Sequence, residues 1–190
     1  MYGFKYWWPA DSPLEVIEGA VLAQNTSWKN AEMALANLKG KTAEELLNMA
    51  SLTEMIRSAG FYVQKERTLR LLLSHYISEV ENIPSPFELR TELLSIKGVG
   101  KETADSISLY AFHQRTIPID SYTLRFFNRY LGSSFSIRDY ESMRLQLISI
   151  FNQEELMEFH ALIVEHCKLV CKKKPDCLAC GLREKCIKNL

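Results

Sequence analysis

The feature that most constrains the fold of this chain is the repetition of helix-start signatures. A serine or threonine followed three residues later by a glutamate occurs at Ser12, Thr42, Ser51 and Ser85. In such a pair, the hydroxyl and the carboxylate satisfy backbone N–H groups for which the first helical turn has no acceptor. We therefore expect a helix to begin at each of these four positions.

Apolar residues follow the same helical period. One face of a helix expected from Tyr62 to Val80 would carry Leu69, Leu72, Leu73, Tyr76, Ile77 and Val80. Further helices are expected over residues 101–113, 121–131, 137–151 and 154–170. The most extended segment, Arg115–Asp120, contains Pro118, which argues against a central strand. The pattern predicts an all-α protein of short helices.

The composition, 47% hydrophobic and 24% charged, is ordinary for a globular protein. No apolar run approaches the roughly 18 residues that cross a bilayer, and residues 1–9 lack the features of a signal peptide. We expect an intracellular, cytoplasmic protein with no membrane partner.

Charge gives a partial indication of a nucleic-acid partner. The formal net charge is zero, but the segment from Cys167 to Lys188 has seven basic and two acidic residues, a local charge of +5. Lys172, Lys173 and Lys174 are consecutive within it. Such a patch would attract phosphates, although a solvated charged tail has the same composition.

A glycine pair marks a turn between two of the expected helices, in the sequence Ile96-Lys-Gly-Val-Gly-Lys-Glu-Thr103. Glycine permits a tight turn and a close approach of the backbone to a partner. The N–H groups and the dipole of the following helix would point the same way and favour an anion. We expect this turn to bind one DNA phosphate, the alternative being a plain helix–helix turn. The contacting residues would be Gly98, Val99, Gly100 and Lys101.

This turn and the residues after it resemble the endonuclease III family of helix-hairpin-helix DNA glycosylases. That family follows its hairpin with a short extended stretch and an aspartate, and this chain has Ile117-Pro-Ile-Asp120 there. The resemblance extends from the region of Gln24 to the C-terminal cysteines. It implies that Asp120 stabilises the positive charge that develops on the sugar as the glycosidic bond breaks. Taken alone, the local sequence favours a helix N-cap.

Bifunctional members of the family open the second hairpin helix with a lysine that attacks the sugar. The residue at that position here is Glu102, which cannot form a Schiff base. The resemblance therefore implies a monofunctional glycosylase, with Glu102 at the border of the base pocket.

All three tryptophans lie near the N-terminus: Trp7 and Trp8 precede Pro9, and Trp28 follows Gln24-Asn-Thr-Ser27. Two adjacent tryptophans do not easily share one face of a core, and a base taken out of the duplex must stack on flat side chains. The alternative is core packing.

The same segment resembles the 3-methyladenine glycosylase III branch, whose aromatic residues sandwich the flipped base. It implies that Trp8 and Trp28, with Trp7 beside them, stack on the base, and an indole also suits a cationic alkylated purine. Gln24 matches the glutamine that related enzymes insert into the gap left in the DNA, and we expect Asn25 to contact DNA beside it.

The five cysteines all lie between positions 167 and 186. Cys171, Cys177, Cys180 and Cys186 are separated by five, two and five residues. Thiolates from one short loop can hold a metal ion or a four-iron cluster. Zinc sites more often use two Cys-x-x-Cys pairs with a longer spacer, so the spacing favours a [4Fe–4S] cluster, with zinc as the alternative. A disulfide framework is not expected in an intracellular helical protein.

The endonuclease III loop usually has six residues in the first gap, one more than this chain. Cys167, one helical turn before Cys171, is therefore the alternative first ligand, and we favour Cys171. The 3-methyladenine glycosylase III branch does not always carry a cluster. The cluster would fix a loop that presents Lys172, Lys173 and Lys174 to the DNA backbone.

Together these patterns predict two helical lobes. Residues 15–115 would form a helical barrel with the hairpin, and residues 1–14 with 116–190 a second lobe containing the cluster loop (167–190). The predicted function is that of a monomeric base-excision repair glycosylase that acts on double-stranded DNA, on an alkylated purine such as 3-methyladenine. The alternatives are an endonuclease III-like glycosylase and lyase for oxidised bases, a uracil or thymine mismatch glycosylase, and a DNA-binding module without catalysis.

Overall fold

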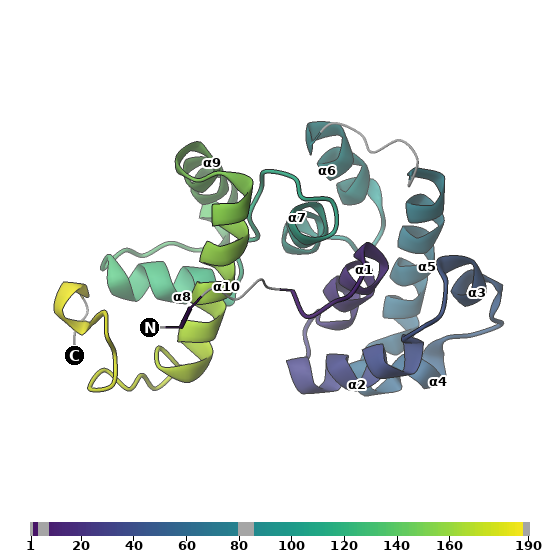
Figure 1. Cartoon of the computed structure of the whole chain (residues 1–190), viewed down its shortest axis with the longest axis horizontal. Helices are drawn as coiled ribbons and strands as arrows, with labels where there is room; N and C mark the ends of the chain where they lie inside the picture. Colours follow the sequence, from purple (N-terminus) through teal and green to yellow (C-terminus); the bar gives the residue numbers. More distant parts are fainter. Residues whose placement is uncertain (1, 4–7, 80–85, 188–190) are drawn as a thin grey trace. The chain divides into compact units, whose positions relative to one another are not determined.

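The computed structural model describes residues 2–3, 8–79 and 86–187, and all regular structure within them is helical, which confirms the all-α class. The longer elements are shown in Figure 1. In chain order the helices are α1 (Pro13–Leu22), α2 (Trp28–Leu38), α3 (Ala43–Asn48), α4 (Thr53–Ile56), η1 (Arg57–Ala59), α5 (Tyr62–Glu79), α6 (Pro86–Ser95), α7 (Lys101–Tyr110), α8 (Ser121–Tyr130), η2 (Ile137–Asp139), α9 (Tyr140–Ile150), α10 (Gln153–Leu169) and η3 (Arg183–Lys185).

Two of the four expected helix starts are confirmed. Ser12 caps α1 by accepting a hydrogen bond from the Glu15 N–H at 3.2 Å. Thr42 and Glu45 form a complete capping box at α3. The start expected at Ser85 lies outside the described residues.

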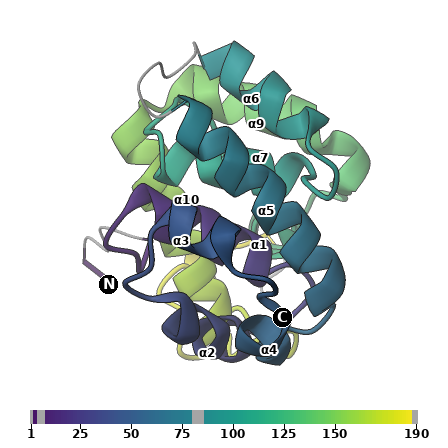
Figure 2. The same ribbon diagram turned by 90° about the vertical axis from the view of Figure 1, so that its right-hand side faces the viewer.

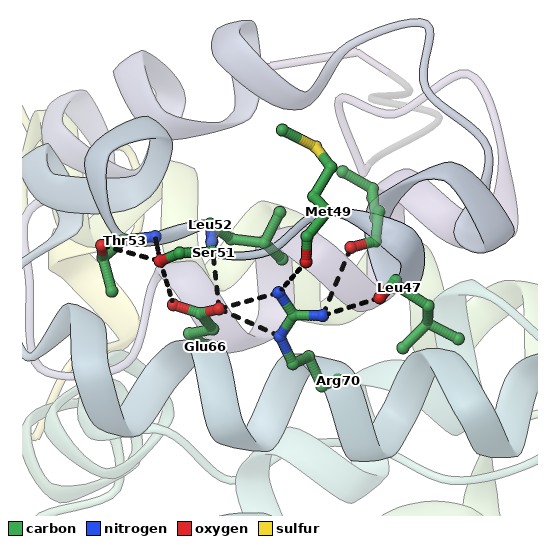
Figure 3. A network of polar contacts seen from close by, with 8 residues as sticks. Leu47, Met49, Ser51, Leu52, Thr53, Glu66 and Arg70 are labelled. Carbon is green, nitrogen blue, oxygen red and sulfur yellow. Dashed lines mark hydrogen bonds and ion pairs between the residues drawn. The ribbon is translucent and has the colours of Figure 1, made fainter.

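The helix expected to start at Ser51 is present but displaced by one residue, because α4 begins at Thr53 with Leu52 at its N-cap. The Ser51 hydroxyl accepts the Thr53 N–H at 3.2 Å and donates to Glu66 of α5 at 3.2 Å. The Leu52 N–H donates to the same Glu66 carboxylate at 3.0 Å, so a carboxylate from another helix joins Ser51 at the start of α4, as Figure 3 shows.

Arg70 extends this network one turn further along α5. Its guanidinium donates to Glu66 at 2.9 Å, to the Leu47 carbonyl at 2.9 Å and to the Met49 carbonyl at 2.7 Å (Figure 3). The last carbonyls of α3 have no partners within their own helix, so a charged donor on α5 satisfies them. The contact fastens α3 along α5, as Figure 2 also shows.

The chain forms two compact units, residues 9–114 and residues 115–190 with the N-terminal residues up to Trp8. In the unit of residues 9–114, α1 packs on α2, α5 and α7, and α6 packs on α7. Its fully buried side chains include Ile17, Leu22, Leu69, Leu73 and Leu93. The face predicted for α5 is correct at Leu69, Leu72 and Leu73, whereas Ile77 is 37% exposed and Val80 lies outside the described residues.

A buried lysine holds the end of α1. Lys65 of α5 is 3% exposed, and its ammonium donates to the carbonyls of Leu22 at 2.9 Å and Ala59 at 2.7 Å. Burial lowers the pKa of Lys65 to about 8. The positive group sits where helix carbonyls concentrate negative charge, and it fixes the chain just before Gln24.

In the second unit, α10 packs on α8 and α9. The extended residues Thr116 to Ile119 are buried and lead directly to Asp120. The residues after α10 form a loop that contains the four expected ligand cysteines and ends near η3. No helix among the described residues has the length and hydropathy needed to span a membrane.

Candidate active site and nucleic-acid interface

The turn between α6 and α7 has the geometry that its glycines predicted. Gly98 has a φ of +94°, which favours glycine, and a Cβ there would lie 2.0 Å from the Thr68 hydroxyl oxygen. That hydroxyl donates to the Lys97 carbonyl at 3.2 Å. Gly100 is extended and stands at the N-cap of α7 without any side-chain cap. Val99 between the glycines is 7% exposed and anchors the turn in the core.

A buried ion pair joins the two helices of the hairpin. Arg90 of α6 donates to both carboxylate oxygens of Asp105 in α7, at 2.8 and 3.1 Å. The Asp105 side chain is fully buried and that of Arg90 is 17% exposed. This two-bond geometry sets the orientation of α7 relative to α6 and therefore the direction of the N-terminus of α7.

The glutamine predicted to enter DNA lies against the hairpin. The Gln24 amide donates to the Gly98 carbonyl at 3.1 Å and to the Thr103 hydroxyl at 2.9 Å. Asn25 follows with a φ of +51°, and its side chain is exposed. The structure therefore brings Gln24, Asn25 and the hairpin together, and insertion of Gln24 into DNA would exchange these two hydrogen bonds for new contacts.

The first turn of α7 exposes Glu102, at the expected nucleophile position, and its neighbour Lys101. Lys101 and Glu102 are both exposed, and Glu102 lies in the first helical turn. The residue at the expected nucleophile position is thus a solvent-facing carboxylate at the positive end of a helix dipole, where it is electrostatically favoured.

Trp28, at the start of α2, lines a cavity of about 180 Å³. Pro9 lines it too, together with the carboxylate residues Glu15 and Glu32 and with Lys39. The Lys39 ammonium is 3.2 Å from Asp11, so its charge has a partner. The cavity offers a flat indole and a proline ring with two acidic groups at its walls.

The other two tryptophans belong to the N-terminal stretch. Trp7 lies outside the described residues. Trp8 is half-buried and directly precedes Pro9 in the sequence. Sequence reasoning did not include Pro9 among the pocket residues, although it follows the two tryptophans directly.

Asp120 stands at the N-cap of α8 and is largely buried, with a side chain 13% exposed. One carboxylate oxygen accepts the Thr123 N–H at 2.7 Å, and the other lies 3.6 Å from Nε2 of His160 in α10. Burial alone would raise the pKa of Asp120, but the interactions with His160 and with Thr123 outweigh it and hold the pKa below its ordinary value. Asp120 is therefore a charged carboxylate that also caps a helix.

Cys171, Cys177, Cys180 and Cys186 all line one cavity of about 310 Å³. Within the described part of the chain, no three His, Cys, Asp or Glu side chains converge as ligands of a single metal ion. Cys167 is 1% exposed, its thiol faces the Tyr122 carbonyl at 3.5 Å, and burial raises its pKa to about 12. Cys167 does not line the cavity, whereas Cys171 does.

Two arginines of α8 hold the backbone of the cysteine loop. Arg125 donates to the carbonyls of Cys171 at 2.9 Å and Cys167 at 3.2 Å. Arg129 donates to the carbonyls of Lys172 and Lys173, and its guanidinium is 3.4 Å from the Cys171 sulfur. The side chains of Lys172, Lys173 and Lys174 remain exposed. The loop thus has a backbone held by α8 and exposed positive charges.

Sequence reasoning missed His160, Arg125 and Arg129 as parts of the site. The sequence could have predicted that Arg125 and Arg129 lie on the same face of a helix, because they are four positions apart. It could not have predicted what that face contacts. No local pattern links His160 to Asp120, since they are 40 positions apart in sequence and lie on different helices.

Comparisons of sequence agree on one family. The HhH-GPD superfamily of base excision DNA repair proteins matches residues 19–153. A candidate DNA repair glycosylase of Methanocaldococcus jannaschii is 42% identical and the match covers 98% of this chain and 90% of that protein. The endonuclease III of Sulfolobus acidocaldarius is 29% identical over 90% of this chain and 79% of its own length.

Solved structures with the same fold include an endonuclease III in a non-covalent complex with DNA, with a TM-score of 0.78, 24% identity and coverage of 95% of this chain and 85% of that one. The 3-methyladenine DNA glycosylase of H. pylori bound to 1,N6-ethenoadenine has a TM-score of 0.70 and 28% identity. The match covers 86% of this chain and 88% of that one. The chain belongs to the HhH-GPD superfamily of base excision DNA repair proteins. More particularly, its activity is that of a DNA N-glycosylase, as the sequence predicted.

Proposed function

We propose that this glycosylase hydrolyses the N-glycosidic bond of an alkylated, positively charged purine such as 3-methyladenine and leaves an abasic site. The observation that carries the proposal is the cavity in which Trp28 and Pro9 lie beside the carboxylates of Glu15 and Glu32. An electron-rich indole attracts a cation over its face, and nearby carboxylates add to that attraction. A cationic base would gain from this cavity more than a neutral one.

In the proposed complex, the flipped base stacks on Trp28, with Trp8 and Trp7 contributing from the N-terminal stretch. The likeness to the H. pylori 3-methyladenine DNA glycosylase, at 28% identity, supports a modified purine as the base. An alkylated purine already leaves readily because its ring carries the positive charge, so the pocket needs no strong acid to protonate it. Glu102 would border the pocket and add a third carboxylate.

Asp120 would act on the sugar. As the bond to the base breaks, positive charge develops on the sugar ring, and a fixed anion stabilises that transition state. The lowered pKa of Asp120 means that its carboxylate is charged throughout the neutral range. The same carboxylate can orient the attacking water, which completes hydrolysis without a covalent enzyme intermediate.

The absence of a lysine at position 102 supports a monofunctional reaction. Strand cutting by β-elimination in this family starts from an amine that attacks the sugar, and Glu102 has none. Hydrolysis would therefore leave the strand intact until the abasic site is cleaved by alkali or another enzyme.

The partner would be double-stranded DNA bound by a monomer. The backbone of residues 98–101 would hold one phosphate at the N-terminus of α7, and Lys172, Lys173 and Lys174 would contact others. Gln24 and Asn25, next to the hairpin, would occupy the gap left by the flipped base.

We also propose a [4Fe–4S] cluster held by Cys171, Cys177, Cys180 and Cys186. The donor set fits, because four thiols share one cavity of about 310 Å³ while Cys167 is buried elsewhere. The spacing of five, two and five residues between these cysteines favours a cluster over zinc. The cluster would cross-link the loop and so support the lysines that contact DNA.

The test is to incubate the purified protein with methylated duplex DNA and to identify the released bases by chromatography. The proposal predicts release of 3-methyladenine, with strand breaks only after alkali. Duplexes with an oxidised pyrimidine, a G·U pair or a G·T pair serve as controls. Cutting without alkali, or release from only these control duplexes, would contradict the proposal, and no release from any duplex would favour a non-catalytic module.

A further inference from the structure

The Asp120 carboxylate is held from two sides within one unit of the protein. The backbone N–H of Thr123 reaches one oxygen at 2.7 Å, and Nε2 of His160 approaches the other at 3.6 Å. His160 is 4% exposed and comes from α10, which packs directly on α8. The two contacts come from different helices, so together they restrict rotation of the carboxylate.

The contact with His160 matters because burying a charged carboxylate is unfavourable. An isolated buried carboxylate would take up a proton, yet Asp120 has a pKa below its ordinary value. Arg125, one turn further along α8, donates to the carbonyls of Cys171 and Cys167, and the groups that lower the pKa of Asp120 are His160 and Thr123. The thiol of Cys167 is buried and has a raised pKa, so it adds no charge.

We propose that His160 is a positioning residue that fixes the orientation of the Asp120 carboxylate toward the sugar. The inference rests on the proposed role of Asp120. His160 touches neither base nor sugar in this account and acts only through Asp120. The separation of 3.6 Å is longer than a strong hydrogen bond, and we expect it to shorten when DNA is bound.

The experiment compares His160→Gln, His160→Asn and His160→Leu in the full-length protein. Glutamine keeps an N–H donor at nearly the reach of Nε2, asparagine is too short, and leucine has no donor. Single-turnover release of 3-methyladenine from methylated duplex should fall about 10–100-fold with Leu and Asn, and Gln should restore most of the rate. The dissociation constant for DNA should change less than about twofold, because no DNA contact is lost.

A matched control uses a second histidine with the same geometry. His75 of α5 lies 3.6 Å from Glu92 in the other unit, and His75→Leu should leave the release rate unchanged. Thermal unfolding of each variant shows whether loss of rate follows loss of fold. If His160→Leu does not fold, the Gln and Asn pair decides the matter, since equal rates for both would overturn the inference.

Asp120→Asn tests the catalytic role of Asp120 separately from the positioning role of His160. If that variant keeps its activity, the catalytic role of Asp120 is wrong and the inference falls with it. If it is inactive while the His160 variants match the parent, only the inference is wrong. In the double variant Asp120→Asn/His160→Leu, a rate no lower than that of Asp120→Asn alone supports action through one carboxylate, and an additive loss contradicts it.

Discussion

At the scale of single residues, the hairpin depends on one glycine much more than on the other. Gly98 has a positive φ, and an added Cβ would lie 2.0 Å from the oxygen, 3.1 Å from Cβ and 3.2 Å from Cγ2 of Thr68. Because the Thr68 Cβ and both of its branches are close, a change of rotamer does not make room. An added Cβ at Gly100 meets nothing within 4 Å.

We therefore expect Gly98→Ala to lower the free energy of unfolding by about 1–3 kcal/mol and to weaken DNA binding. Gly100→Ala is the matched control and should change stability little. Urea unfolding and fluorescence anisotropy with duplex DNA measure the two effects. Equal behaviour of the two variants would mean that Gly98 does not shape the turn.

Glu18 is the residue whose ionisation should most affect stability. It is 1% exposed on α1, and its Oε1 has no hydrogen-bond partner among the described residues. Burial, together with the nearby charge of Glu15, raises the pKa of Glu18 from 4.5 to about 8. The folded state therefore keeps a proton on Glu18 that the unfolded chain releases.

The sign of the pH effect follows from this difference. Below pH 4.5 the carboxyl is protonated in both states and adds no penalty, and the penalty grows from there until pH reaches about 8. Glu18→Gln should raise the free energy of unfolding by on the order of 2–4 kcal/mol at pH 8, with little gain at pH 4. Denaturant unfolding at several pH values measures it, and a gain independent of pH would contradict the raised pKa.

At the scale of elements, the ion pair between α6 and α7 should stabilise the hairpin. Removing Arg90 leaves the buried carboxylate of Asp105 without its two-bond partner. Arg90→Met should lower the free energy of unfolding by about 3–5 kcal/mol. Arg57→Met, which breaks an exposed pair with Glu54, is the control and should have no measurable effect. Similar losses of unfolding free energy in Arg90→Met and Arg57→Met would show that burial of the ion pair does not cause the destabilisation.

The helices themselves could be predicted because their determinants are local. Thr42 and Glu45 lie three residues apart and cap α3 within one turn. The start expected at Ser51 is displaced by one residue, and there a carboxylate from another helix, Glu66, 15 residues away in sequence, binds the Ser51 hydroxyl. Contacts of that kind depend on packing and leave no local pattern.

The same distinction applies to the candidate site. Gly98 and the four cysteines could be found because each forms a compact motif. The approach of His160 to Asp120 and the hold of Arg129 on the cysteine loop could not, since they arise only when α8 and α10 pack together.

At the scale of the whole molecule, the cysteine loop should depend on Cys171 and not on Cys167. Cys171→Ser should lose iron and acid-labile sulfide and become more sensitive to protease in the loop, because one ligand is missing. Cys167→Ser is the control, since its thiol faces the Tyr122 carbonyl. Metal analysis and visible absorption measure the content. Loss of iron only in Cys167→Ser would mean that Cys167, and not Cys171, is the first ligand. Stoichiometric zinc in the parent protein would mean that the site holds zinc and not an iron–sulfur cluster.

The charged carboxylate of Asp120 is proposed to promote hydrolysis of the glycosidic bond to a cationic base. The most direct test of this role is the single-turnover rate of 3-methyladenine release from methylated duplex by the parent protein and by Asp120→Asn. Asparagine retains the cap of α8, so the fold should persist. The account predicts a fall of at least about 100-fold, with DNA affinity nearly unchanged and no strand cutting by either protein. Equal rates in the two proteins would contradict it.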